Sequence, residues 1–148
     1  MARRRLRQAT ARRLGIHENA QNCLYLDRFS PTSTIIDVGC ADDADFSRFM
    51  IEAYGLRSFG VDPTRKHASA LRALEASLEG NFQYVPLAVS DTVGQITFSE
   101  SVHHVSGSLC PSHRNLASGD SVSYPVDSVT LGELLRRLGL ERADYLKL

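Results

Sequence analysis

The chain has 148 residues, of which 43% are hydrophobic and 23% are charged, and its formal net charge at pH 7 is +0. This length suits one globular domain with a buried core, and the composition is ordinary for a soluble protein. No apolar run approaches the roughly 20 residues of a membrane-spanning helix, and the N-terminal arginines are not followed by the apolar stretch of a secretory signal. We therefore expect no transmembrane segment.

The charges are distributed unevenly along the chain. Six arginines precede the first acidic residue, Glu18, so 11 basic residues remain against 17 acidic ones, and residues 18–148 carry about −6. We expect residues 1–17 to form a basic arm and residues 18–148 to form the domain. The arm is expected to be a solvated helix or a frayed terminus. The alternatives are that it contacts nucleic acid or anionic lipid, or that it is a transit peptide. The acidic domain argues against a nucleic-acid partner. The three cysteines form no CxxC pair, which favours reduced thiols in a cytoplasmic setting.

Short apolar strands alternate with amphipathic helices from residue 34 onwards. Thr34–Val38 is an apolar run typical of a buried strand, and residues 43–54 place apolar side chains on one helical face. Ser58–Val61 predicts a second strand, Thr64 can cap a second helix, and Phe82–Val89 predicts a third strand. This order of strands and helices predicts an α/β domain with a parallel sheet and right-handed crossovers.

The second half of the chain has a different pattern. Gln95–Phe98 predicts a short antiparallel strand, and residues 99–120 form a long segment with no clear period. Val122–Val126 could form another strand, and Thr130–Glu133 is a capping box that opens a leucine-rich helix. Asp144–Leu148 predicts one further strand, and the sequence ends at Leu148. We therefore expect a sheet that is incomplete after its fourth core strand, in a chain that is a piece of a longer protein.

The turn after the first strand is typical of a site for a nucleotide-like cofactor. Gly39 lets the backbone approach a ligand, and Asp62 follows it by 23 residues, close to the spacing at which an acid accepts ribose hydroxyls. The turn also carries Asp42, Asp43 and Asp45, which would repel the pyrophosphate of a dinucleotide. S-adenosylmethionine has no phosphate and carries two cationic groups, so nearby carboxylates suit it. The sequence therefore favours S-adenosylmethionine as the cofactor.

Six stretches occur in a fixed order over residues 34–148. They are IIDVGCADDADFS (35–47), FGVDP (59–63), VPLAVSDTVGQITF (85–98), SGSL (106–109), YPVDSVTLGELL (124–135) and DYLKL (144–148). In this order they resemble the FkbM family of S-adenosylmethionine-dependent methyltransferases. The chain departs from the family pattern at Ala41 and Asp43, where Asn and Gly are usual, and at Asp62, where Glu is usual.

The resemblance implies a Rossmann-like class I methyltransferase fold with a mostly parallel sheet in a three-layer α/β/α arrangement. With the crossover rule it predicts that the strand of Ile35–Val38 lies between those of Ser58–Val61 and Tyr145–Leu148. The strand of Phe82–Leu87 is then expected on the outer side of Ser58–Val61. It also implies O-methylation of a small-molecule or glycan acceptor, such as the hydroxyl of a sugar, glycolipid or natural product.

The resemblance also implies which residues contact the cofactor. The methionine end would lie against Asp37, Gly39, Cys40 and Ala41, and the ribose against Asp62. The adenine would lie beside Pro63 and would also contact the residues after the third strand, Ala88, Val89, Ser90 and Asp91. Cys40 as a small buried residue and Asp37 as a group that orients the turn are the structural alternatives. No catalytic residue is assigned, although His103, His104 and His113 are candidate bases, and no metal site is expected.

Two other functions stay open on the sequence alone. One is an NAD(P)-binding oxidoreductase domain, which the aspartates and the single glycine of the turn disfavour. The other is a truncated, non-catalytic module that binds the cofactor or only a partner. The open edge of the final strand also predicts that the chain could form a homo-oligomer.

Overall fold

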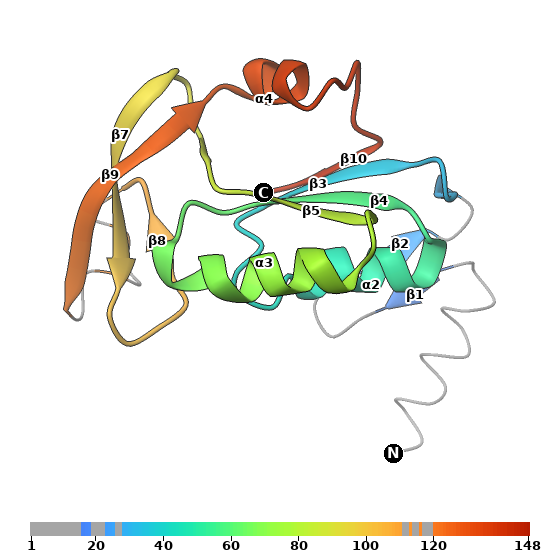
Figure 1. Ribbon diagram of the computed structural model, residues 1–148, viewed down its shortest axis with the longest axis horizontal. Helices are drawn as coiled ribbons and strands as arrows, with labels where there is room; N and C mark the ends of the chain where they lie inside the picture. Colours follow the sequence, from blue (N-terminus) through green and yellow to red (C-terminus); the bar gives the residue numbers. More distant parts are fainter. Residues whose placement is uncertain (1–15, 19–22, 26–27, 111–112, 114–115, 117–119) are drawn as a thin grey trace.

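The computed structural model describes residues 16–18, 23–25, 28–110, 113, 116 and 120–148, and it shows an α/β protein with parallel strands, consistent with a Rossmann-like arrangement (Figure 1). Most of the predicted basic arm lies outside these residues. A small antiparallel pair, β1 (Ile16–Glu18) and β2 (Cys23–Tyr25), crosses the boundary predicted at residue 17.

Four parallel strands form the central sheet in the order β10-β3-β4-β5. They are β3 (Thr34–Val38), β4 (Arg57–Val61), β5 (Phe82–Val85) and β10 (Tyr145–Lys147). Ile35 is paired with Ser58 on one side and with Tyr145 on the other. The predicted order is therefore confirmed, with the strand of Ile35–Val38 between its two expected neighbours.

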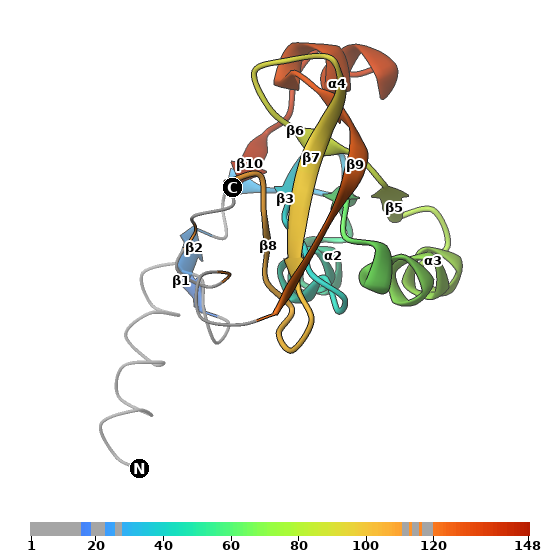
Figure 2. The same ribbon diagram turned by 90° about the vertical axis from the view of Figure 1, so that its left-hand side faces the viewer.

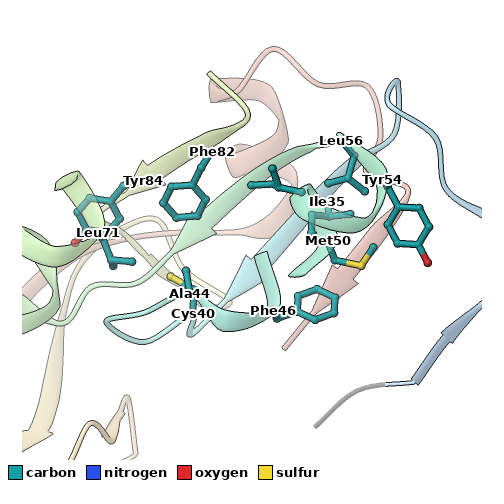
Figure 3. Close-up of a cluster of buried hydrophobic side chains, with 11 residues drawn as sticks. Ile35, Cys40, Ala44, Phe46, Met50, Tyr54, Leu56, Leu71, Phe82 and Tyr84 are labelled. Carbon is teal, nitrogen blue, oxygen red and sulfur yellow. The ribbon is translucent and has the colours of Figure 1, made fainter. Parts of the chain in front are cut away.

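Helices cover both faces of this sheet. α2 (Asp45–Tyr54) and α3 (Ala68–Ser77, after the 3-10 turn η2, Arg65–His67) lie on one face, and α4 (Leu131–Arg137) lies on the other (Figure 1). Ile35 and Ile36 are adjacent in β3 and point to opposite faces, because side chains alternate along a strand. Ile35 packs with residues of α2 and α3, as Figure 3 shows, and Ile36 packs with residues around α4.

The helix boundaries follow from local chemistry. α2 ends at Gly55, whose φ of 67° is left-handed and whose N–H donates to the Ile51 carbonyl at 2.7 Å. The predicted capping residue Thr130 precedes α4, and its Oγ1 accepts a hydrogen bond from Glu133 N at 3.2 Å. Thr64 also precedes its helical turn as predicted, but its side chain makes no capping hydrogen bond.

A second sheet lies at the carboxyl ends of the parallel strands (Figures 1 and 2). Its order is β6-β9-β7-β8, and its strands are β6 (Ala88–Val89), β7 (Gly94–Ser101), β8 (Gly107–Ser108) and β9 (Ser121–Val129). β7 and β9 are antiparallel from Gly94↔Ser128 to Ser101↔Ser121. The predictions of an antiparallel strand over 95–98 and a further strand over 122–126 are confirmed, and both strands are longer than predicted.

The prediction of one continuous strand over Phe82–Val89 is wrong. β5 ends at Val85, and Ala88–Val89 instead pair with β9 in the second sheet. Pro86 follows Val85 directly and has no N–H to donate to a neighbouring strand, so it ends the pairing. The chain therefore moves from the first sheet to the second at this proline.

Candidate functional site

A cavity of about 400 Å³ lies at the carboxyl ends of β3 and β4, where ligands of open α/β sheets bind. The second sheet and the loop after β7 form its opposite side. Its lining residues are Val38, Gly39, Ala41, Asp62, Pro63, Thr64, Ala88, Phe98, Val105, Ser106, Gly107, Leu109 and His113. Five of the ten predicted cofactor residues are among them: Gly39, Ala41, Asp62, Pro63 and Ala88.

The turn from β3 to α2 has an unusual backbone. Gly39 has φ 69°, Ala41 has φ 58° and Ala44 has φ 43°, and the last two are positions where a side chain makes the left-handed region costly. Gly39 N donates to the Val61 carbonyl at 2.8 Å, which fixes the turn to the end of β4. A Cβ added at Gly39 would meet no atom within 4 Å, so the space beside this backbone is open.

Asp62 holds this turn through its carboxylate. Oδ2 accepts from Ala41 N at 3.0 Å and Oδ1 accepts from Thr64 N at 2.8 Å, while the residue is 3% exposed. His67 Nδ1 lies 3.4 Å from Oδ2. Burial alone would raise the pKa of Asp62, but the hydrogen bonds from His67 and Thr64 outweigh it and lower the pKa below its usual value.

These contacts change the expected role of Asp62. The sequence predicted only a ribose contact for Asp62, whereas the structure shows that both carboxylate oxygens also bind backbone N–H groups and support the turn. Asp62 also lines the cavity, where its carboxylate is a candidate acceptor for a ligand hydroxyl beside the backbone and side-chain donors of Thr64. The Asp62 carbonyl is also occupied, by the hydroxyl of Tyr84 at 3.0 Å.

Asp37 lies beneath the turn in a buried polar network. It is 0% exposed, its Oδ2 accepts from Ser47 Oγ at 2.8 Å, and Ser47 Oγ in turn accepts from Ser58 Oγ at 2.8 Å. Lys147 Nζ lies 2.8 Å from Asp37 Oδ1, an ion-pair distance without the alignment of a hydrogen bond, and donates to the Gly39 carbonyl at 3.3 Å. Asp37 therefore does not line the cavity, and its carboxylate contacts the side chains of Ser47 and Lys147.

The other predicted residues lie outside the cavity lining. Cys40 is 2% exposed in the core beside α2 and α3 (Figure 3), and burial, together with Asp62 and Asp37, raises the pKa of its thiol far above the usual value. Val89 packs against the core around Ile36, and Ser90 Oγ bonds Ser128 Oγ at 2.6 Å. Asp91 is exposed. Cys40 is thus a small buried residue of the core, which was the structural alternative to a cofactor contact.

Several cavity residues have no recognisable signal in the sequence. Thr64, Phe98 and Val105 reach the cavity from three different segments, and no spacing rule connects them. The sequence pattern places His67 only within a helix. Its spacing of five residues from Asp62 across a Pro-containing turn is the one signal that could have indicated their contact. Of the three candidate bases, His113 lines the large cavity.

Comparison with protein-family models finds no match for this chain, and comparison with curated proteins finds no significant match. The resemblance to the FkbM family therefore stays a prediction. In the part of the chain that the structure describes, no helix is both long and apolar enough to cross a membrane.

Proposed function

We propose that this chain binds S-adenosylmethionine in the 400 Å³ cavity and belongs to a class I methyltransferase, with O-methylation of a sugar, glycolipid or natural product as its reaction. The observation that carries the proposal is the position of the cavity, at the carboxyl ends of β3 and β4 and beside an acid-rich turn. Its volume is within the roughly 300–1,000 Å³ typical of small-molecule sites.

The lining residues fit this cofactor. The open space beside Gly39 can receive a ligand against the backbone, and apolar contacts from Pro63, Ala88 and Phe98 suit a purine ring. The Asp62 carboxylate, in the cavity lining, can accept one ribose hydroxyl. Bound S-adenosylmethionine would supply a methyl group made electrophilic by its sulfonium charge.

The charges at the cavity favour a cation over a phosphate. Asp42 and Asp43 are exposed in the turn before α2, and Asp62 is ionised within the lining. Carboxylates near a sulfonium and an ammonium are favourable, whereas the same carboxylates repel a pyrophosphate. This preference favours S-adenosylmethionine over NAD(P).

Isothermal titration calorimetry with S-adenosylmethionine, S-adenosylhomocysteine and NAD tests the proposal. The wild-type chain should bind the first two and not NAD. Ser106→Trp places a large side chain in the cavity lining and should weaken S-adenosylhomocysteine binding by at least ~10-fold, which is about 1.4 kcal/mol. Ser121→Trp, on the exposed start of β9 and outside the lining, is the matched control and should bind normally.

The outcomes separate the candidate functions. Binding of NAD alone would replace the methyltransferase proposal with the oxidoreductase. Binding of neither ligand by a folded chain would refute cofactor binding at this cavity. Equal binding by Ser106→Trp and wild type would place the cofactor elsewhere.

A further inference from the structure

A second cavity, of about 270 Å³, adjoins the candidate cofactor site. Its lining residues are Asp42, Lys66, His67, Val102, His103, His104 and Val105. Val105 lines both cavities, and Asp42 follows Ala41, which lines the first. Groups bound in the two cavities would therefore be neighbours across this loop and turn.

His67 is the residue of the second cavity that lacks a partner it needs. It is 2% exposed, and its buried Nε2 has no hydrogen-bond partner among the described residues. A buried polar atom without a partner loses the hydrogen bond that water would give it, so such atoms are rare unless a ligand or water completes them. Because His67 lines the cavity, a ligand group that enters beside the ring is the candidate partner for Nε2, which lies just beneath the cavity surface.

The neighbours of His67 define which chemical group would satisfy Nε2. An ionised carboxylate only accepts hydrogen bonds, so the proximity of Asp62 Oδ2 to Nδ1, at 3.4 Å, assigns the ring proton to Nδ1. In the neutral ring Nε2 then carries a lone pair, and the partner it lacks is an O–H or N–H donor. A hydroxyl group meets this requirement, and an anion does not.

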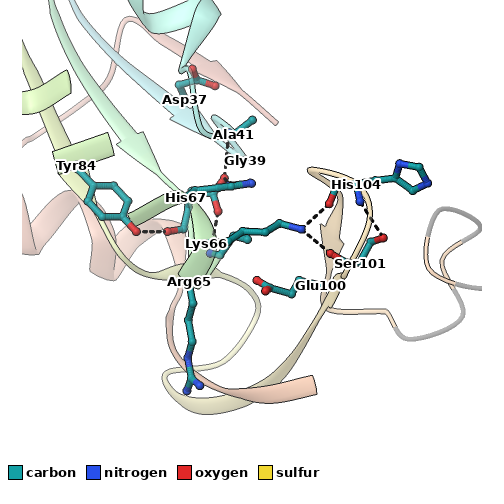
Figure 4. Close-up of polar contacts among 12 residues, drawn as sticks. Asp37, Gly39, Ala41, Arg65, Lys66, His67, Tyr84, Glu100, Ser101 and His104 are labelled. Atoms are coloured by element: carbon teal, nitrogen blue, oxygen red, sulfur yellow. Dashed lines mark hydrogen bonds and ion pairs between the residues drawn. The ribbon is translucent and has the colours of Figure 1, made fainter. Parts of the chain in front are cut away.

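The nearest cation of the cavity is already engaged. Lys66 Nζ donates to the carbonyls of Ser101 and His104, which fixes the loop after β7 beside the His67 ring (Figure 4). Ser101 Oγ in turn accepts from the backbone N–H groups of His103 and His104, at 3.2 Å each. The loop after β7 therefore forms a polar wall of the cavity that hydrogen bonds hold in place. On the other side, no donor group reaches Nε2 of His67 among the described residues.

We propose that the second cavity receives the hydroxyl group of the methyl acceptor and that His67 Nε2 takes its proton. This inference rests on the proposed function and extends it to the acceptor. The acceptor oxygen bonds the methyl carbon while the sulfur–carbon bond breaks, and the hydroxyl proton passes to Nε2. The products are a methyl ether, S-adenosylhomocysteine and a His67 imidazolium.

Asp62 supports this step as a positioning residue. Its carboxylate accepts from Nδ1–H, so that in the neutral ring the lone pair is on Nε2, and it stabilises the imidazolium that forms. The same carboxylate binds the Ala41 N–H of the cofactor turn at 3.0 Å. One side chain thus connects the cofactor site with the base.

A small methylating reagent, methyl 4-nitrobenzenesulfonate, tests the reactivity of Nε2 without requiring the acceptor. The ester carbon–oxygen bond breaks as the nitrogen–carbon bond forms, and the sulfonate leaves. Peptide mapping by mass spectrometry should show methylation of His67 in the folded chain, because the cavity brings the reagent beside the ring. The modification should be lost in His67→Gln and retained in the matched control His103→Gln. In Asp62→Asn it should be slower by roughly tenfold, because the ring is no longer oriented.

Calorimetry with S-adenosylhomocysteine separates this inference from the proposed function. His67→Gln should bind this ligand within about twofold of wild type, because His67 lines the second cavity and not the first. A His67 that stays unmethylated in the folded chain while His103 is methylated overturns the inference, whether or not the cofactor binds. A reactive His67 in a chain that binds no S-adenosylhomocysteine refutes the methyltransferase proposal and leaves a base for another reaction.

Discussion

Asp62→Asn should destabilise the folded chain, because the carboxylate binds backbone N–H groups on both of its oxygens. The amide that replaces it keeps one oxygen, so either Ala41 N or Thr64 N loses its acceptor and faces an NH₂ group. Hydrogen bonds to a charged acceptor contribute about 1.5–3 kcal/mol each, and the contact with His67 weakens as well. We expect a loss of roughly 2–3 kcal/mol, which lowers the Tm by roughly 5–10 °C for a chain of this size.

Thermal and urea unfolding followed by circular dichroism measure this loss. Asp43→Asn removes the same charge from an exposed position of the same turn and should change the free energy of unfolding by less than about 0.5 kcal/mol. If Asp62→Asn were as stable as Asp43→Asn, the hydrogen bonds to the turn would not contribute as described.

The pH dependence gives the same prediction a second readout. The pKa of Asp62 in the folded chain lies below the value of 3.8 of an unperturbed carboxyl group, so the unfolded chain takes up its proton first as the pH falls. The stabilisation is complete above pH 3.8 and is lost as the pH falls through the folded pKa. The difference in stability between wild type and Asp62→Asn should therefore shrink with acidification in this window, and a difference that is constant down to the folded pKa would contradict the assignment.

Three further predictions concern packing, capping and association. Gly60→Ala should cost about 1–3 kcal/mol of unfolding free energy, because the added Cβ would lie 2.5 Å from Phe82 Cζ. The control Gly132→Ala, in α4, meets no atom within 4 Å and should be neutral or stabilising. Equal Tm values for the two variants would contradict this. Thr130→Ala should cost about 1 kcal/mol in chemical denaturation through the lost bond to Glu133 N, and Thr92→Ala serves as an exposed control. β10 is an edge strand of its sheet, so sedimentation at increasing concentration should show self-association, and a single monomeric species throughout would count against it.

The pattern of the sequence was sufficient for the order of the parallel strands. Short apolar runs such as Thr34–Val38 alternate with helical periods, and the crossover rule with the resemblance leaves few arrangements of them. Pro86 marks the break between β5 and β6, but the apolar pattern continues across it, and the partner of Ala88–Val89 is β9, about 40 residues later. Pairing between distant segments has no local signal.

The candidate site was predicted in position but less well in detail. Gly39 and Asp62 were expected at the ends of neighbouring strands, and both line the cavity. The contact between Asp62 and Ala41 N depends on the left-handed φ of Ala41, which alanine rarely adopts and which no propensity predicts. His67 contacts Asp62 through a 3-10 turn, which the prediction of a helix capped by Thr64 did not distinguish from an α-helix.

The position of β10 beside β3 affects the order in which the chain can fold. β3, β4 and β5 follow one another along the chain and pair locally, whereas Thr34 N binds the Asp144 carboxylate across 110 residues. Contacts between such distant segments form slowly, so we expect β3 to pair with β4 first and with β10 in a later step. Pulse-labelling hydrogen exchange should show protection of β4 amides before those of β10, and simultaneous protection would contradict this order. During the interval, one side of β3 has its hydrogen-bonding groups open to other chains, and a crowded refolding mixture would lose yield at this stage.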